Sequence, residues 1–209
     1  MRFFSPYRYK ILEVKMDIKQ LIQDNFSQSI ATKQQAQLTM LEPIADAVNL
    51  IVAAFQNGKK MLICGNGGSA ADAQHFAAEF TGRFEIERTP LPAIALTTDT
   101  SALTAIGNDY GFEVVFSKQV EALGQAGDIL YAISTSGNSL NVLKAMEVAR
   151  AKGMDVIAMV GRDGGKIAQQ LTGKDVNLCV PVERTARIQE VHLLTLHTIC
   201  DAVDTLMFK

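Results

Sequence analysis

Short apolar runs alternate with helical stretches along most of the chain. Five runs are predicted strands, and several lack the polar alternation of a half-exposed strand: residues 60–64, 92–97, 128–134, 155–160 and 176–180. The stretches at about 70–82, 111–124, 139–152 and 164–171 have helical spacing. This order predicts an α/β fold of three αβα layers around a five-stranded parallel sheet, with ligands bound beyond the carboxyl ends of the strands.

Helical periodicity also flanks this region on both sides. Apolar residues on one face predict a helix from Asp17 to about Ile30, and a second helix at about 41–56 holds Pro43 in its first turn. The last helix, at about 185–207, is apolar nearly all round. We expect such a helix to be buried on several sides, partly at a subunit interface.

Neither a linker nor an internal repeat interrupts the chain, so a single domain is predicted over residues 16–209. It comprises N-terminal helices at about 17–57, an α/β core at about 58–182 and the last helix at about 185–207. The first fifteen residues are basic and aromatic without clear periodicity. We expect residues 1–15 to be a disordered tail or an upstream extension, and we assign them no function.

Composition excludes several classes of protein. Twenty lysines and arginines against 22 acidic residues give a net charge of −2 without a run of like charges, which argues against a nucleic-acid partner. Cys64, Cys179 and Cys200 are odd in number and widely spaced, so neither a disulfide framework nor a zinc knuckle is expected. No apolar run approaches the roughly 18 to 20 residues that cross a bilayer, and no secretory signal is recognisable. The sequence predicts a cytoplasmic protein without a membrane contact.

Glycines follow the first predicted strand, in the run Gly65-Asn66-Gly67-Gly68-Ser69 that leads into a helix. Glycine allows the backbone to approach a ligand, and the N–H groups of a helix N-terminus favour an anion. Gly65, Gly67 and Ala70 also satisfy a degenerate dinucleotide motif, with Glu85 or Glu87 at the distance of a ribose contact. A tight turn without a ligand explains the same residues.

Hydroxyl groups follow the third predicted strand, in the run Ser134-Thr135-Ser136-Gly137-Asn138-Ser139. Four hydroxyls within six residues, just before a helix, can bind a phosphate dianion without a lysine. Helix capping by Asn138 or Ser139 accounts for one or two of these residues only. Because two small anion loops suit one monophosphate better than a pyrophosphate, the expected ligand is a sugar phosphate.

The segment from Gly161 to Lys166 superficially resembles a nucleotide-binding P-loop. Its glycine spacing is wrong, and Ile167 stands where a serine or threonine must bind magnesium. We therefore predict a turn at this position.

Candidate acids and bases lie on two predicted helices. His75 and Glu79 are four residues apart, so they share a face, and their helix begins at the glycine run. On the last helix, His192 lies among apolar positions and is expected to be a core histidine. His197 shares a face with polar residues. A solvated surface pair explains His75 and Glu79 equally well, and periodicity alone leaves His197 open.

Three segments together resemble the sugar isomerase (SIS) domain family: Cys64–Ser69, Ser134–Ser139 and Arg187–His192. The resemblance is strongest to its phosphoheptose isomerase branch and covers almost everything from Met16 onward. It implies a homotetramer with the N-terminal helices packed in its core and with active sites between subunits. It also implies conversion of sedoheptulose 7-phosphate to D-glycero-D-manno-heptose 7-phosphate, an early step toward the heptose of lipopolysaccharide core.

The same resemblance implies roles for individual residues. The substrate-binding positions fall on the two loops and on two further residues: Asn66, Gly67, Gly68, Ser69, Asp109, Ser134, Thr135, Ser136, Ser139 and Gln189. The acid/base pair falls on Glu79 and His197. Some family members bind zinc, one ion per subunit, at positions that match His75, Glu79, Gln189 and His197. Zinc ligand and free base are competing roles for Glu79, because a metal lowers the basicity of a carboxylate.

Two hypotheses without catalysis stay open beside the enzyme. A related SIS protein binds the bacterial replication initiator, and Ala186, Leu193 and Leu194 resemble that branch. The branch typically lacks an acid at the position of Glu79 and has asparagine at that of His197, so the presence of both residues favours the enzyme. A regulatory module that senses a sugar phosphate would carry the same loops without turnover.

Overall fold

Five parallel strands form one sheet in the order β2-β1-β3-β4-β5. The computed structural model describes residues 17–209, so the extension predicted at 1–15 lies outside the described residues. All five predicted strands are confirmed, as β1 (Met61–Cys64), β2 (Ala93–Ala95), β3 (Ile129–Ser134), β4 (Asp155–Gly161) and β5 (Val176–Val180). The strand order reverses between β1 and β3, which is where an open parallel sheet binds ligands beyond its carboxyl edge.

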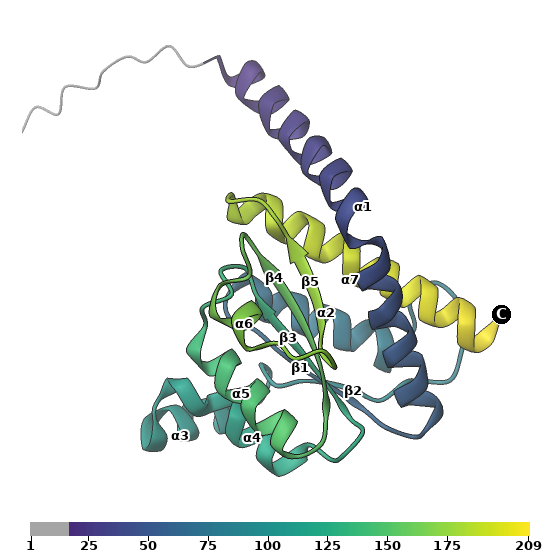
Figure 1. Cartoon of the computed structure of the whole chain (residues 1–209), viewed down its shortest axis with the longest axis vertical. Helices are drawn as coiled ribbons and strands as arrows, with labels where there is room; N and C mark the ends of the chain where they lie inside the picture. The colour runs from purple at the N-terminus through teal and green to yellow at the C-terminus, as the bar shows by residue number, and fades with distance from the viewer. Residues whose placement is uncertain (1–16) are drawn as a thin grey trace, which may run out of the picture.

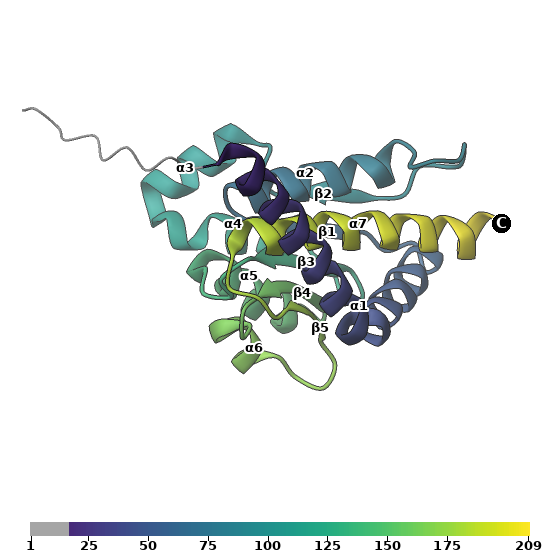
Figure 2. The ribbon, with the colours of Figure 1, turned by 90° about the horizontal axis from the view of Figure 1, so that it is seen from above.

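Helices cover both faces of the sheet, as the predicted three-layer fold requires (Figures 1 and 2). One face carries α1 (Ile18–Gln56), α2 (Gly68–Thr81) and α7 (Thr185–Phe208), and the other carries α4 (Val115–Leu123), α5 (Leu140–Ala151) and α6 (Gly165–Gln170). Each face of the sheet packs into its own hydrophobic core. Along β3, Tyr131 packs into the core beneath α1, α2 and α7, whereas Leu130 and Ala132 pack into the core beneath α4, α5 and α6. Because both faces of β1, β3 and β4 are buried, these three strands have no polar alternation.

The N-terminal region differs from its prediction. A single helix of 39 residues, α1, replaces the two predicted helices. Residues 31–40 contain neither glycine nor proline and are mostly good helix formers, so nothing ends the helix there. Pro43 lies inside α1, where its missing N–H removes one helical hydrogen bond without breaking the helix.

One helix was missed entirely. The helix α3 (Thr100–Tyr110) precedes a short 3-10 turn, η1 (Phe112–Val114), and the helix predicted at 111–124 corresponds to η1 and α4 together. Asp99 caps α3, because its side chain accepts a hydrogen bond from the N–H of Ala102 at 2.9 Å. No residue of α3 is buried in the chain. Its core-facing stripe is short, since only Leu103 and Ile106 pack, partly buried, against the core on the α4 and α5 side of the sheet, and so short a stripe gives a weak periodic signal.

Helices α1 and α7 pack against each other over the sheet, and the first half of α1 extends beyond the rest of the fold (Figure 1). In the single chain, α7 is buried on one broad side, and the predicted burial of its other side at a subunit interface stays a prediction. Leu193, Leu194 and Leu206 are 40, 48 and 58 % exposed, although the opposite side of α7 lies in the core. These leucines leave an apolar surface on α7.

By length and composition alone, α1 and α7 could each cross a membrane, which the sequence analysis did not anticipate. This is weak support for a membrane contact, because core helices of globular proteins pass the same test. Both helices also pack on the sheet and contribute to its core.

The cysteines are all free, as predicted. Cys64 and Cys200 are buried, and Cys179 is half-buried. Burial raises the pKa of the Cys64 thiol to about 12 and also raises the pKa of Cys200. Buried thiols with raised pKa values are unreactive.

Candidate active site

The two predicted anion loops follow strands that are neighbours in the sheet. Cys64, the last residue of β1, pairs with Ala132 of β3, so residues 65–69 and 135–139 lie at the same edge. The amides of Asn66 and Asn141 exchange two hydrogen bonds of 2.8 and 2.9 Å, which join the first loop to the start of α5. Both loops therefore flank the point where the strand order reverses.

The glycine loop packs closely against α7. A Cβ atom at Gly68 would collide with the amide nitrogen of Gln189, at the flexible end of that side chain, so the two residues are in close contact. The helix α2 begins at Gly68 with no side-chain cap. The N–H groups of Ser69 and Ala70 donate to the carbonyl oxygens of Asn66 and Gly67, both at 3.0 Å, so what this helix start offers an anion is mainly the positive end of the helix dipole.

The hydroxyl loop is held by its own side chains. Ser134 Oγ and Ser139 Oγ lie 2.9 Å apart, and Ser136 Oγ accepts a hydrogen bond from the N–H of Asn138 at 3.2 Å. Ser139 makes no side-chain hydrogen bond to the first turn of α5, so the alternative that it serves as a capping residue is wrong. Asn138 bonds to the carbonyl oxygen of Ser136 and to the N–H of Lys166 instead.

The segment that resembles a P-loop is a turn, as predicted, and it supports the hydroxyl loop. Ile167 donates its N–H to the carbonyl oxygen of Gly137 at 2.9 Å. Gly137 has a φ of +63°, and a Cβ atom there would collide with the carbonyl group of Gly164. The close approach of these two backbones therefore depends on glycine at position 137.

Helices α2 and α7 bring His75, Glu79 and His197 into one cluster. The two Nε2 atoms of the histidines lie 2.9 Å apart, and Oε1 of Glu79 lies 3.3 Å from Nε2 of His75. One ligand atom from each residue lies within 4.8 Å of the others. His75 is exposed and the other two are half-buried, so the cluster is accessible. Two imidazoles and a carboxylate at this spacing can bind a metal ion or transfer protons.

Apolar packing fixes α2 behind the cluster. Its predicted core stripe is confirmed, since Ala73, Phe76, Ala77 and Phe80 are all buried. Asp72 is half-buried near His75. Burial raises the pKa of the Asp72 carboxyl above its usual value, although the charge of His75 acts in the opposite direction. The ring of Phe84 lies 5.6 Å from that of His197, between centroids.

His192 is a core histidine, as predicted. Its side chain is fully buried, and its Nε2 lies 3.1 Å from the carbonyl oxygen of Val160. Burial lowers its pKa from 6.5 to about 4, which keeps the imidazole neutral at pH 7. His192 therefore plays no part in the cluster.

None of the predicted substrate-binding residues is hydrogen-bonded to the cluster within residues 17–209, and two of them, Gln189 and Asp109, lie outside both loops. Gln189 lies against Gly68 at the start of α2, eight residues before His197 on α7. Asp109 is exposed on α3, where it accepts a hydrogen bond from Nδ2 of Asn108 at 2.8 Å. Their roles toward a ligand stay predictions.

Two buried polar groups next to the site are not among the predicted residues. Asn141 joins the glycine loop to the start of α5, and Arg88 forms an ion pair with Asp204 of α7. Neither residue belongs to a motif or to a helical face that points to function. The sequence marks Asn141 and Arg88 only as polar residues close to candidate site residues. Many surface positions share that feature, so it does not identify them.

Residues 25–161 match the family model described as SIS domain. The matched segment ends with β4 and includes both loops and the α2 residues of the cluster. The parallel sheet, with both loops at its carboxyl edge, agrees with this match. The chain belongs to the SIS domain family.

Phosphoheptose isomerases are highly similar to the chain over nearly its whole length. One from Neisseria meningitidis serogroup C (strain 053442) is 58% identical over 192 residues, covering 92% of this chain and 98% of the relative. A solved phosphoheptose isomerase from Neisseria gonorrhoeae matches with a TM-score of 0.86 and 56% identity, over 90% of this chain and 99% of that one. A solved phosphoheptose isomerase from Francisella tularensis matches with a TM-score of 0.88 and 44% identity, over 91% of this chain and 100% of that one. Within the SIS family, the chain belongs to the phosphoheptose isomerases, which are aldose/ketose isomerases.

Proposed function

We propose that this chain converts sedoheptulose 7-phosphate to D-glycero-D-manno-heptose 7-phosphate, on the route to ADP-heptose and lipopolysaccharide core. The observation that carries the proposal is the meeting of a carboxylate and an imidazole from separate helices, Glu79 and His197, in one accessible cluster. The names of the relatives support the choice of substrate. The same geometry supports an enzyme over a protein that only binds the replication initiator.

The phosphate end of the sugar would bind between the two loops. Hydroxyls of Ser69, Ser134, Thr135, Ser136 and Ser139 donate to phosphate oxygens, near the positive end of the α2 dipole. Hydroxyls and N–H groups hold a dianion without a fixed positive charge. Asn66 and Asp109 are proposed to contact the sugar itself.

The reaction moves a proton between two adjacent carbons. Glu79 removes a proton from C1 of the open-chain ketose, and the electron pair forms an enediolate with the C2 carbonyl. Glu79 then returns the proton to C2, which leaves an aldehyde at C1. His197 opens the ring or transfers the proton between the two oxygens. Positioned acids and bases of this kind contribute on the order of 10²- to 10⁴-fold each.

The donor set of the cluster fits zinc. Two imidazole nitrogens and a carboxylate are ligands of catalytic zinc sites, and here their donor atoms lie within 4.8 Å of one another. We infer that His75, Glu79 and His197, with Gln189 as the fourth ligand, hold one zinc ion per subunit. Such an ion polarises a carbonyl group and stabilises negative charge on its oxygen. Glu79 acts as the base only in a state in which it does not bind the metal.

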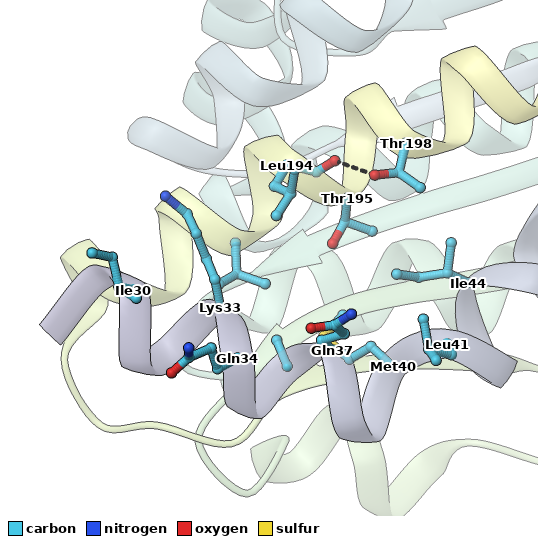
Figure 3. Close-up of a pocket in the computed structure, with 12 residues that line it drawn as sticks. Ile30, Lys33, Gln34, Gln37, Met40, Leu41, Ile44, Leu194, Thr195 and Thr198 are labelled. Atoms are coloured by element: carbon cyan, nitrogen blue, oxygen red, sulfur yellow. Dashed lines mark hydrogen bonds between the residues drawn. The ribbon is translucent and has the colours of Figure 1, made fainter. Parts of the chain in front are cut away.

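The apolar surface of α1 and α7 supports a homotetramer with active sites between subunits. A groove of about 390 Å³ lies between the two helices (Figure 3). Its lining includes Ile30, Leu41 and Ile44 from α1 and Leu194 from α7. A second subunit would bury these side chains. The three free thiols agree with a cytoplasmic location.

Turnover tests the proposal directly. The purified protein is incubated with sedoheptulose 7-phosphate, with and without a chelator, and NMR detects the aldose product. We expect turnover that the chelator lowers, and a loss of about 10²- to 10⁴-fold in Glu79→Gln.

The matched control is Glu87→Gln, since Glu87 is exposed and pairs only with Arg83 within residues 17–209. It should keep wild-type turnover. A folded Glu79→Gln variant with near wild-type turnover would refute the assignment of Glu79. Capture of the replication initiator by a wild-type protein without turnover would favour the alternative.

A further inference from the structure

Arg88 is buried behind the cluster, in the segment between α2 and β2. Its side chain is 1% exposed. The guanidinium donates hydrogen bonds to three carbonyl oxygens at the end of α2: those of Glu79 at 2.7 Å, Phe80 at 2.8 Å and Gly82 at 3.2 Å. Its Nε donates to Oδ1 of Asp204 at 2.8 Å.

Asp204 lies on the same helix as the candidate acid/base histidine. Its side chain is 2% exposed, and it follows His197 by seven residues on α7. Residues seven apart are two turns apart on one face of a helix. One guanidinium therefore joins the backbone of Glu79 to the helix that carries His197.

This link differs from the other polar contact between the two helices. Within residues 17–209, the only hydrogen bond between side chains of α2 and α7 is that between His75 and His197. The two histidines must give up this contact when they bind a substrate or a metal. The bonds of Arg88 can persist, because none of their atoms belongs to the cluster's side chains.

The chemistry of Arg88 suits a rigid link. The last carbonyl groups of a helix lack helical partners, and α2 has no basic residue in its last turn. A planar guanidinium can serve several carbonyls and a carboxylate at once, with fixed geometry, which a lysine ammonium cannot do. Its positive charge is also favourable at the C-terminal end of a helix.

We propose that Arg88 and Asp204 are positioning residues that fix Glu79 relative to His197 for proton transfer. The proposal rests on the proposed function of these two residues. Arg88 is too deeply buried to touch the substrate. It acts through the backbone of Glu79 and through α7. Its hydrogen bonds reach neither the glycine loop, at the other end of α2, nor the hydroxyl loop before α5.

The main test is the double variant Arg88→Met with Asp204→Leu. Removing both charges avoids a single unpaired charge in the core, which a single substitution would leave. We expect a folded protein with kcat lower by about 10- to 100-fold, because small displacements of catalytic groups have effects of this size. KM should stay within about threefold, since the phosphate loops are unchanged. Arg88→Lys keeps the charge but not the planar geometry, so its kcat should fall between those of the wild type and the double variant.

The control is a second partly buried ion pair of the same chemistry. Arg150 and Asp175 lie 3.0 Å apart and join α5 to the segment before β5, away from α2 and α7. The double variant Arg150→Met with Asp175→Leu should lower thermal stability and leave kcat unchanged. An equal loss of kcat in both double variants would reduce Arg88 and Asp204 to a purely structural role.

Imidazole NMR supplies a measurement that is independent of turnover. The chain has three histidines, and two of them are in the cluster. In the metal-free protein, removing the Arg88 link should shift the ring signals of His75 and His197 and leave His192 unchanged. Wild-type kcat together with unshifted ring signals would overturn the inference. If the double variant does not fold, the same two measurements on Arg88→Lys decide.

The outcomes separate this inference from the proposed function. If the wild type does not isomerise the sugar phosphate, the proposed function fails. Shifted ring signals in a variant of that inactive protein would still show that Arg88 positions the cluster.

Discussion

The three histidines of the chain lie in two different environments, one accessible and one buried. His75 and His197 lie next to Glu79 in an accessible cluster. His192 is buried, and its Nε2 hydrogen-bonds to the carbonyl oxygen of Val160. Within residues 17–209, its Nδ1 has no hydrogen-bond partner. A proton on that nitrogen would place a charge in the core, which explains the low pKa of His192.

His192 should make stability depend on pH. Its pKa is about 4 in the folded protein and 6.5 without burial, so the unfolded chain binds the proton more readily between these values. The stability it contributes is present above pH 6.5 and is lost as the pH falls toward 4. Between pH 7 and pH 5 the free energy of unfolding should drop by on the order of 2 kcal/mol from this group.

Urea unfolding at both pH values, at one protein concentration, measures this effect. His192→Gln is the comparison, because its amide can donate to the same carbonyl and does not titrate. The variant should lose this part of the pH dependence. Equal pH dependence in both proteins would contradict the argument.

The surroundings of a single side chain can be predicted from the sequence where they follow from the pattern of its own helix. His192 was predicted correctly because its neighbours on α7 are apolar. Arg88 could not be predicted, since its partners are the carbonyls of α2 and a carboxylate on α7 that only the fold brings together.

At the scale of elements, the strands were predictable and some helices were not. Strands buried on both faces are plain apolar runs, and β1 and β3 are fully buried. The helix α3 has no fully buried residue, and its core-facing side consists of two partly buried residues, Leu103 and Ile106, which is a weak pattern. The predicted break in α1 failed because no residue between 31 and 40 disfavours a helix.

The hydroxyl loop depends on glycine at position 137. In Gly137→Ala, the positive φ and the collision with the Gly164 carbonyl would displace the loop. We expect KM for the sugar phosphate to rise by about tenfold or more, equivalent to roughly 1.4 kcal/mol of binding. The change in kcat should be smaller, because the cluster lies on other elements.

Steady-state kinetics check this prediction against Gly173→Ala. A Cβ atom at Gly173 has open space around it, so that variant should keep the wild-type KM. A normal KM in a folded Gly137→Ala variant would show that the hydroxyl loop does not hold the phosphate.

At the scale of the whole molecule, the single chain leaves an apolar surface on α1 and α7. Leu41 and Leu194 line the groove between these helices (Figure 3) and are 64 and 48 % exposed. The sequence indicated an interface because α7 is apolar nearly all round. It could not specify which side of α7 faces the core, since that depends on where α1 packs.

Charge in this groove should dissociate the assembly. Leu41→Asp with Leu194→Asp would place carboxylates in a buried interface, which is strongly unfavourable. Light scattering should find the mass of the proposed tetramer for the wild type and a smaller mass for the double variant, together with a loss of turnover if sites lie between subunits. Leu123→Asp on α4 is the control, because Leu123 is exposed on the other side of the sheet. An unchanged mass in the double variant would place the interface elsewhere.

The central claim is that the carboxylate at position 79 carries a proton from one carbon of the sugar to the next. Isomerisation in D₂O, followed by NMR and mass spectrometry, tests it most directly. Because the cluster is accessible, the proton on Glu79 exchanges with the solvent in part of the turnovers, so the account predicts some deuterium on C2 of the heptose product. In Glu79→Gln, product and carbon-bound deuterium should both form about 10²- to 10⁴-fold more slowly. A folded Glu79→Gln variant that forms both at the wild-type rate would contradict the account.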